Sequence, residues 1–293
     1  REYMTPPEIF SYRKAGSNPN EQGWDIRVVP DKEPILDPAE PMKKYGVGMF
    51  DAMRATGAHE LVLETPCHRQ EWGDITAERI GRIIAIYRSR INELKQDSRI
   101  KYVMVTKNHG VTAGACLHHP HSHIVGLPIV PKRVQEELEG AELYYDYKER
   151  CVYCDMVSQE LDDEVRLVAE THDFLAFCPF ASRFPYEIWI LPKNHNSHFD
   201  NINEDEMRGL ALILRATILK LVRILDEPPF NLFLHSSTFD QEHIDHYHWH
   251  FELIPKLTKD AGFEWGSGFF INPTVPEEAA MLLRESEVEE KTE

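Results

Sequence analysis

The stretch His118-His-Pro-His-Ser-His-Ile-Val-Gly-Leu-Pro128 decides how this sequence is interpreted. It places the imidazoles of His119, His121 and His123 at alternate positions. Alternate side chains of a β-strand point to the same face of a sheet, so an extended backbone here gathers the three rings. Such a group has little use in an apolar core, but it suits metal binding, phosphate binding or a nucleophile with supporting neighbours. The alternative is a polar strand edge whose histidines are incidental.

A second stretch, His246-Tyr-His-Trp-His-Phe-Glu-Leu-Ile-Pro255, repeats the alternation. Each stretch follows an earlier histidine at a similar distance, since His68 precedes His119 by 51 residues and His195 precedes His248 by 53. Both intervals contain a helical pattern followed by a strand pattern. This agreement of spacing and order predicts tandem copies of one unit, and the alternative is two unrelated α+β domains.

The two helices are predicted from periodicity and capping. In the first copy, apolar residues recur every three or four positions from about residue 74, namely Ile80, Ile83, Ile84, Tyr87, Ile91 and Leu94. In the second copy, Asn203 and Glu206 form a capping-box pattern. That helix should continue to about Leu225, ahead of Pro228 and Pro229. Strand patterns flank the helices at residues 59–68, 102–106, 186–195 and 231–235.

We therefore predict an α+β fold built from duplicated units, in which helices pack on antiparallel sheets. The first half covers residues 1–135 and carries the first histidine stretch. The second half covers residues 150–284, and the charged residues 285–293 form a flexible tail. A linker around residues 132–149 should be partly helical.

The composition narrows the class of protein. The chain has 293 residues, of which 42% are hydrophobic, and this excludes a disordered or low-complexity protein. No apolar run approaches the roughly 20 residues that span a bilayer, so we expect no membrane association. The formal charge of −17 disfavours a nucleic-acid partner but allows a small phosphorylated ligand. The chain begins at Arg1 without a signal-peptide pattern, and we expect that its true N-terminus is missing.

The five cysteines, an odd number, predict a cytoplasmic protein with a metal or redox site rather than a disulfide framework. Cys151 and Cys154 form a C-x-x-C pair without the thioredoxin-like context that a redox pair usually requires. Zinc prefers tetrahedral sulfur and nitrogen ligands. We predict a zinc site made of Cys151, Cys154, His195 and His248, and the alternative is a pair of buried thiols.

The repeat predicts an equivalent site in the first half, with His68 and His119 as ligands. The first half offers no C-x-x-C pair, since Cys67 adjoins His68 and has no partner at that spacing. The missing cysteines would lie upstream of Arg1, unless the first-half site has been lost.

Three segments of the chain resemble the galactose-1-phosphate uridylyltransferase family, a duplicated branch of the histidine-triad superfamily, and are close to its ADP-glucose phosphorylase-like subgroup. They are Lys107-Asn-His-Gly-Val-Thr-Ala-Gly-Ala-Cys-Leu-His-His-Pro-His-Ser-His123, Tyr186-Glu-Ile-Trp-Ile-Leu-Pro-Lys-Asn-His195 and Ala261-Gly-Phe-Glu-Trp-Gly-Ser-Gly-Phe-Phe-Ile-Asn-Pro273. The resemblance runs from about Asp25 to Arg284. It implies tandem histidine-triad-like units and a homodimer.

The resemblance also implies a role for individual residues. His121 would be the nucleophile, and His68 and His119 would be zinc ligands. The residues that contact substrate would be Asn108, Gly110, Cys116, His123, Glu264 and Lys259. The implied reaction exchanges a nucleoside monophosphate between a nucleotide-sugar and a hexose 1-phosphate through a covalent nucleotidyl-histidine. One ring nitrogen of His121 should then donate to a backbone carbonyl, and the amides of residues 110–115 should hold the phosphate.

The chain departs from the family pattern at four positions. His123 stands where the uridylyltransferases have glutamine, Cys116 replaces a serine, Phe263 replaces a tyrosine and Asp31 replaces an asparagine. His123 favours a second hypothesis, a nucleotide-sugar or dinucleotide phosphorylase or hydrolase that uses the same nucleophile with phosphate or water as acceptor. A hypothesis of another class is a non-catalytic, zinc-stabilised nucleotide-binding module.

The second histidine triplet lacks a Gly/Ala loop before it. We therefore expect the second half to be a metal-stabilised partner that contributes sugar contacts, and not a second active site.

Overall fold

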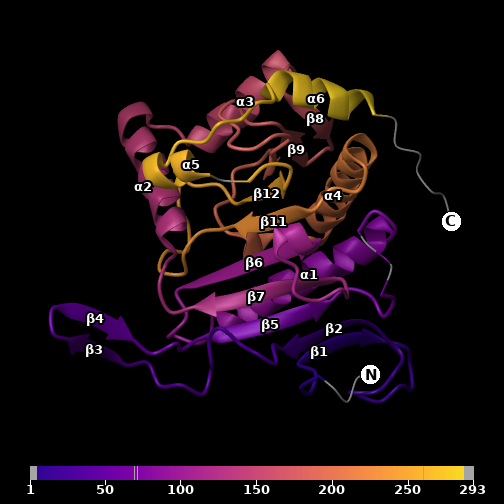
Figure 1. Ribbon diagram of the computed structural model, residues 1–293, viewed down its shortest axis with the longest axis vertical. Coiled ribbons are helices and arrows are strands. Elements are labelled where there is room, and N and C mark those ends of the chain that lie inside the picture. Colours follow the sequence, from indigo (N-terminus) through magenta and orange to yellow (C-terminus); the bar gives the residue numbers. More distant parts are fainter. Residues whose placement is uncertain (1–4, 69, 71, 260, 287–293) are drawn as a thin grey trace.

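Ten antiparallel strands form one continuous sheet in the computed structural model, which describes residues 5–68, 70, 72–259 and 261–286 (Figure 1). Their order across the sheet is β1-β2-β5-β7-β6-β11-β12-β10-β9-β8. The strands are β1 Phe10–Arg13, β2 Trp24–Pro30, β5 Ala58–Leu63, β6 Tyr102–His109, β7 His121–Leu127, β8 Leu167–Glu170, β9 Phe174–Phe177, β10 Ile188–Pro192, β11 Phe230–His235 and β12 His250–Pro255. The predicted α+β class with antiparallel pairing is confirmed.

The strand order has the symmetry of a duplication. The order β5-β7-β6 on one side of the sheet is mirrored by β10-β12-β11 on the other, and β6 pairs with β11 in the middle. The strands of the first half lie below this junction in Figure 1 and those of the second half lie above it. The strands of the two copies therefore form a single sheet and not two separate sheets. The boundaries 1–135 and 150–284 stay a prediction.

Two long helices, one from each copy, pack side by side. Helix α1 spans Ala77–Leu94 and is capped by Thr76, while α4 spans Glu204–Leu225. The predicted capping box is confirmed, because the Asn203 side chain accepts from the amide of Glu206 and the Glu206 side chain accepts from the amide of Asn203. Capping of this kind satisfies helix amides that have no partner within the helix.

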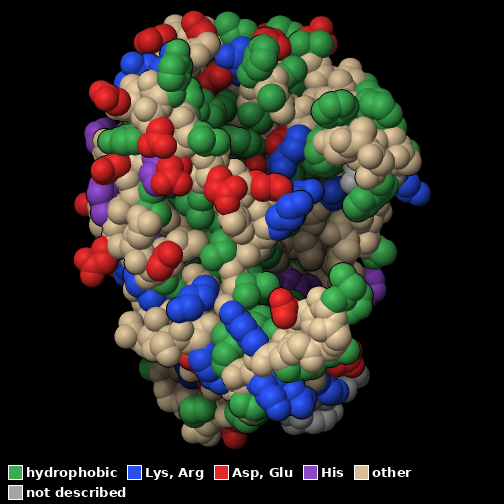
Figure 2. Space-filling model, turned by 90° about the vertical axis from the view of Figure 1, so that its left-hand side faces the viewer, with side chains coloured by type: hydrophobic (Ala, Val, Ile, Leu, Met, Phe, Trp, Pro, Cys, Tyr) green, Lys and Arg blue, Asp and Glu red, His purple; other side chains and the backbone are tan. Residues whose placement is uncertain are grey.

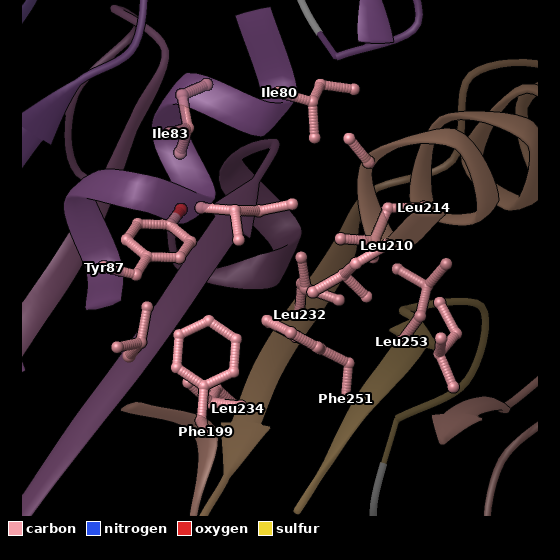
Figure 3. Packing of buried hydrophobic residues seen from close by; sticks show 14 of the residues in the cluster. Ile80, Ile83, Tyr87, Phe199, Leu210, Leu214, Leu232, Leu234, Phe251 and Leu253 are labelled. Atoms are coloured by element: carbon pink, nitrogen blue, oxygen red, sulfur yellow. The ribbon is translucent and has the colours of Figure 1, made fainter. Parts of the chain in front are cut away.

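The apolar stripes of α1 and α4 meet the central strands in one hydrophobic core (Figure 3). Ile83 of α1, Leu214 of α4, Leu232 of β11 and Leu253 of β12 are each at most 2% exposed. Burial of such a side chain stabilises a fold by roughly 1.5–3 kcal/mol. Residues of both copies therefore fill the same core, which packs against the β6–β11 junction.

The segment between the copies is helical, as predicted in part. Helix α2 spans Lys132–Lys148, and α3 spans Val152–Asp163. Cys151 is the N-cap of α3 and Cys154 lies in its first turn, so the helical spacing of three residues turns both thiols to one side. Two short helices follow β12, α5 over Gly262–Ser267 and α6 over Pro276–Glu285. Of the predicted tail, residues 287–293 lie outside the described part of the chain.

A two-stranded hairpin, β3 Lys44–Val47 and β4 Phe50–Met53, projects from the body of the molecule (Figure 1). No sequence pattern predicted it. Its tip carries exposed apolar side chains, with Met49 89% and Phe50 67% exposed. None of the helices formed by the described residues combines the length and the apolar character needed to cross a bilayer.

Candidate active site and metal centre

His121 is the first residue of β7 and lies beside a small cavity. Its Nδ1 donates to the backbone carbonyl of His119 at 2.7 Å, which confirms the predicted contact. With the proton on Nδ1, the lone pair is on Nε2. No hydrogen bond engages Nε2 among the described residues. The ring is 2% exposed, yet it lines the cavity and is not packed away in the apolar core. The geometry therefore leaves one nucleophilic nitrogen available.

The cavity has a volume of about 140 Å³ and is formed mainly by the end of β6 and the loop that follows it. The lining includes Lys107, Asn108, Gly110, His119 and His121. The Lys107 ammonium is paired with the buried carboxylate of Glu64 at 2.6 Å. This ion pair offsets much of the positive charge that Lys107 would otherwise offer to a ligand. Figure 2 shows the side of the molecule from which the hairpin projects, where a hollow containing histidine side chains is bordered by Lys and Arg.

The loop after β6 is tightly folded on itself. Gly110 has φ +82°, and a Cβ there would lie 3.0 Å from the Pro229 side chain, so only glycine fits without strain. The amides of Ala113 and Ala115 donate to the Gly110 carbonyl, and that of Gly114 donates to Val111. These internal bonds use three of the amides predicted to hold a phosphate. A phosphate contact would therefore fall to residues 110–112.

Only some of the other predicted substrate residues lie near the His121 cavity. Asn108 and Gly110 line the cavity, and the His123 ring lies 4.8 Å from that of His121. Cys116 is exposed, with its Sγ 3.6 Å from the Gly114 carbonyl. Within the described part of the chain, no hydrogen bond or ion pair connects Lys259 or Glu264 to this group.

Lys259 and Glu264 follow the end of β12 in the chain. Glu264 accepts from the Ala261 amide and thereby caps α5, while Lys259 is exposed. Their predicted contact with a sugar is not formed within this chain alone, and it stays a prediction.

Sequence reasoning missed a polar chain behind His123. His59 Nε2 lies 3.0 Å from His123 Nδ1, and His59 Nδ1 lies 3.3 Å from a carboxylate oxygen of Asp31. Burial, reinforced by His121 and His59, lowers the pKa of His123 to about 4. His123 is therefore neutral near pH 7. Asp31 had been noted only as a departure from the family pattern, and the strand pairing that brings His59 to His123 could not be predicted.

A second unpredicted cluster lies in the other copy, where His235 and His250 are directly opposite each other on β11 and β12. Their rings stack at 4.7 Å, and His235 Nδ1 lies 3.0 Å from Glu137 of α2. Burial lowers the pKa of His235, but hydrogen bonds to Glu137 and Glu252 outweigh it and raise the pKa to about 10. His250 is the counterpart of His121 and is fully buried. The expectation that this half has no second active site stays a prediction.

The four residues predicted to bind zinc in the second half come together. The ligand atoms of Cys151, Cys154, His195 and His248 all lie within 4.8 Å of one another. Cys154 Sγ is 3.4 Å from His195 Nδ1 and 3.7 Å from His248 Nδ1. His195 Nε2 donates to the Ile244 carbonyl at 3.0 Å, which leaves Nδ1 free to act as a ligand.

This donor set fits a metal ion. Two sulfurs and two imidazole nitrogens are a usual set for structural zinc. Hydrogen bonding to Cys154 lowers the pKa of the Cys151 thiol, although burial opposes it, so a thiolate is favoured. His248 Nε2 is buried and has no hydrogen-bond partner in the described part of the chain, which leaves Nδ1 as the nitrogen aimed at the other donors.

The first-half pair is also brought together. His68 Nδ1 and His119 Nδ1 are 3.0 Å apart, and His119 Nε2 donates to the Thr65 carbonyl at 2.6 Å. As in the second half, two histidines are paired and a backbone carbonyl holds one ring, but here the held ring is His119, the counterpart of His248, and not the counterpart of His195. Two histidines alone do not complete a zinc site, so the first-half site stays a prediction.

Comparisons with known proteins match two stretches of the chain to known families. Residues 124–286, more than half of the chain, match the family described as galactose-1-phosphate uridyl transferase, C-terminal domain. Residues 43–130 match the N-terminal domain of a family of unknown function, DUF4931.

Two relatives cover nearly the whole chain. An ADP-glucose phosphorylase of Arabidopsis thaliana is 33% identical over 289 residues, covering 97% of this chain and 80% of the relative. A galactose-1-phosphate uridylyltransferase of Thermotoga maritima is 33% identical over 276 residues, covering 91% and 86%. The crystal structure of an Arabidopsis thaliana ADP-glucose phosphorylase with bound ADP-glucose superposes with a TM-score of 0.86 at 31% identity, covering 98% of this chain and 89% of that one.

Proposed function

Because the chain belongs to the galactose-1-phosphate uridyl transferase family, whose members transfer nucleotidyl groups, we propose that it transfers a nucleoside monophosphate from a nucleotide-sugar through His121. The observation that carries the proposal is the geometry of His121. Nδ1 is held by a carbonyl, Nε2 is unengaged, and the ring lines a cavity beside a glycine-containing loop.

The proposed reaction has two steps. In the first, His121 Nε2 attacks the α-phosphorus, an N–P bond forms, and the bond from that phosphorus to the bridging oxygen breaks, releasing the sugar 1-phosphate. In the second, an oxygen of the acceptor phosphate attacks the same phosphorus and the N–P bond breaks. The hydrogen bond from Nδ1 to the His119 carbonyl stabilises the positive charge on the ring between the steps.

The acceptor distinguishes the two leading hypotheses. A hexose 1-phosphate makes the enzyme a uridylyltransferase-like exchanger, and inorganic phosphate makes it a phosphorylase. The two relatives bearing these names are each 33% identical to this chain over the aligned residues. His123 in place of glutamine supports the phosphorylase hypothesis. Both share the covalent intermediate.

We expect protein mixed with UDP-glucose or ADP-glucose labelled at the α-phosphorus to retain acid-labile label. After removal of free nucleotide, hexose 1-phosphate, inorganic phosphate and buffer alone are added separately. Discharge by one phosphate compound much faster than by buffer identifies the acceptor. A protein that binds nucleotide but never retains label would contradict covalent transfer and support the binding-module hypothesis.

We further propose zinc at Cys151, Cys154, His195 and His248. The metal would fasten α3 to the segments around β10 and β12 and would not contact the substrate. Its thiolates require a reducing compartment, which supports a cytoplasmic location.

We also propose a homodimer. The hairpin tip exposes Met49 and Phe50, and the segment around α5 exposes Trp265 and Phe269 by 77% and 69%. Exposed apolar side chains on projecting segments of this kind commonly mark an interface. Pairing with a second copy would also explain why Glu264 makes no contact with the His121 cavity of its own chain.

Replacing Met49 and Phe50 together by aspartate should convert the dimer to monomer at micromolar concentration, because each buried apolar side chain contributes roughly 1.5–3 kcal/mol. Size-exclusion chromatography with light scattering measures the mass. Leu143→Asp on α2, also an exposed apolar residue at 69%, is the matched control. An unchanged dimer in the hairpin variant, or a monomeric wild type, would contradict the proposal.

A further inference from the structure

Asn231 of β11 contacts the active-site loop from the second copy. It lies directly opposite Asn108 at the β6–β11 junction and is 6% exposed. Its Nδ2 lies 2.7 Å from Asn108 Oδ1 and 2.8 Å from the Ala113 carbonyl oxygen. One buried amide thus bridges the cavity-lining Asn108 and the loop after β6.

The polarity of this bridge can be worked out from the Ala113 carbonyl. A carbonyl oxygen only accepts, so the group of Asn231 that faces it must be the amide nitrogen. Both N–H bonds of Asn231 are then used, one on Ala113 and one on Asn108. Asn108 must therefore present its oxygen to Asn231, and its own NH2 group is turned away from that contact.

Asn108 lines the cavity that also contains His121. An NH2 group directed there is a donor, which an anionic phosphate oxygen accepts. The opposite orientation would present a carbonyl oxygen to the phosphate and repel it. A rotation of the Asn108 amide by a half-turn therefore decides whether this side chain attracts or repels the phosphate.

We propose that Asn231 is a positioning residue that holds the Asn108 amide with its NH2 group toward the diphosphate of the substrate. This inference rests on the proposed function for the identity of the ligand. Asn231 acts through Asn108 and need not touch substrate. Its backbone pairs with that of Asn108 across the β6–β11 junction, so the sheet itself aligns the two amides.

The sharpest test is Asn231→Asp. A carboxylate of the same shape has no donor, so Asn108 must rotate to donate to it, which turns the Asn108 oxygen toward the cavity. We expect affinity for ADP and UDP, measured by calorimetry, to fall about 10- to 100-fold, the range of a hydrogen bond to a charged group. Affinity for adenosine and uridine should change less than about twofold, since they carry no phosphate.

Asn231→Ala separates positioning from simple structural support. It removes the same two bonds and leaves a void, so a structural role predicts at least as large a loss as in N231D. Positioning predicts a loss of only a few-fold, because a free Asn108 amide can still turn its NH2 group to the phosphate. Equal losses in the two variants would overturn the proposal.

In N231D, part of the loss of affinity could come from the added negative charge alone. A double-mutant cycle with Asn108→Ala separates this part from the part that acts through Asn108. We expect the effect of N231D on ADP and UDP affinity to be at least tenfold smaller in the N108A background. The same fold-loss in both backgrounds overturns the proposal. Asn201→Asp at an exposed site is the matched control for the substitution.

If N231D does not fold, the comparison of N231A in the wild-type and N108A backgrounds tests the proposal. The few-fold loss of ADP and UDP affinity caused by N231A must then be absent in the N108A background. Diphosphate affinity does not require covalent chemistry. A wild type that binds ADP or UDP but retains no label contradicts the proposed function and leaves this test intact.

Discussion

His121→Gly is expected to lower nucleotidyl transfer by at least about 10⁴-fold while the fold is retained, because removal of a nucleophile eliminates the covalent route. The structure explains why folding should survive. His121 is at the start of β7 beside a cavity, and among the described residues its side chain hydrogen-bonds only to the carbonyl of His119, two residues earlier in the chain. Product formation with excess nucleotide-sugar and acceptor measures the rate, and thermal unfolding reports the fold.

The matched control is His172→Gly. This imidazole is 94% exposed in the turn between β8 and β9, so its loss should leave the transfer rate unchanged. A folded H121G protein that turns over at nearly the wild-type rate, or still retains labelled nucleotide, would show that another group is the nucleophile.

Cys154→Ser is expected to remove the bound metal and to lower the melting temperature by roughly 10 °C, since structural zinc contributes about 10–16 kcal/mol of binding energy to small domains and even a fraction of this shifts Tm by several degrees. Cys154 faces both His195 and His248, so its loss breaks the centre of the donor set. Elemental analysis gives the zinc content and calorimetry gives Tm.

Cys116→Ser, at an exposed thiol, is the control and should keep both the metal and the melting temperature. Wild-type protein purified without chelator and found free of metal would contradict the zinc proposal. Full zinc content in the C154S variant would contradict this ligand assignment.

The sequence was sufficient for features set by short-range geometry. Alternation along a strand brings His121 and His123 together on β7, although His119 precedes the strand, and the capping pattern of Asn203 and Glu206 marks where α4 begins. The C-x-x-C spacing at the start of a helix turns Cys151 and Cys154 to one side. The repeated interval between histidines also indicated the duplication, because similar chain lengths between equivalent residues persist after a gene segment is copied.

The tertiary structure alone decided which distant side chains meet. Asn231 reaches Asn108 because the two copies join their sheets at β6 and β11, and His59 reaches His123 because β5 pairs with β7 in one register. A slip of one residue in either pairing would turn these side chains to the opposite face. The register of a strand pair is set by which side chains along its whole length are buried on each face of the sheet, and not by a few polar residues. The histidine that we propose as the nucleophile was therefore identified from the sequence, whereas the residues around it that come from distant segments were identified only from the fold.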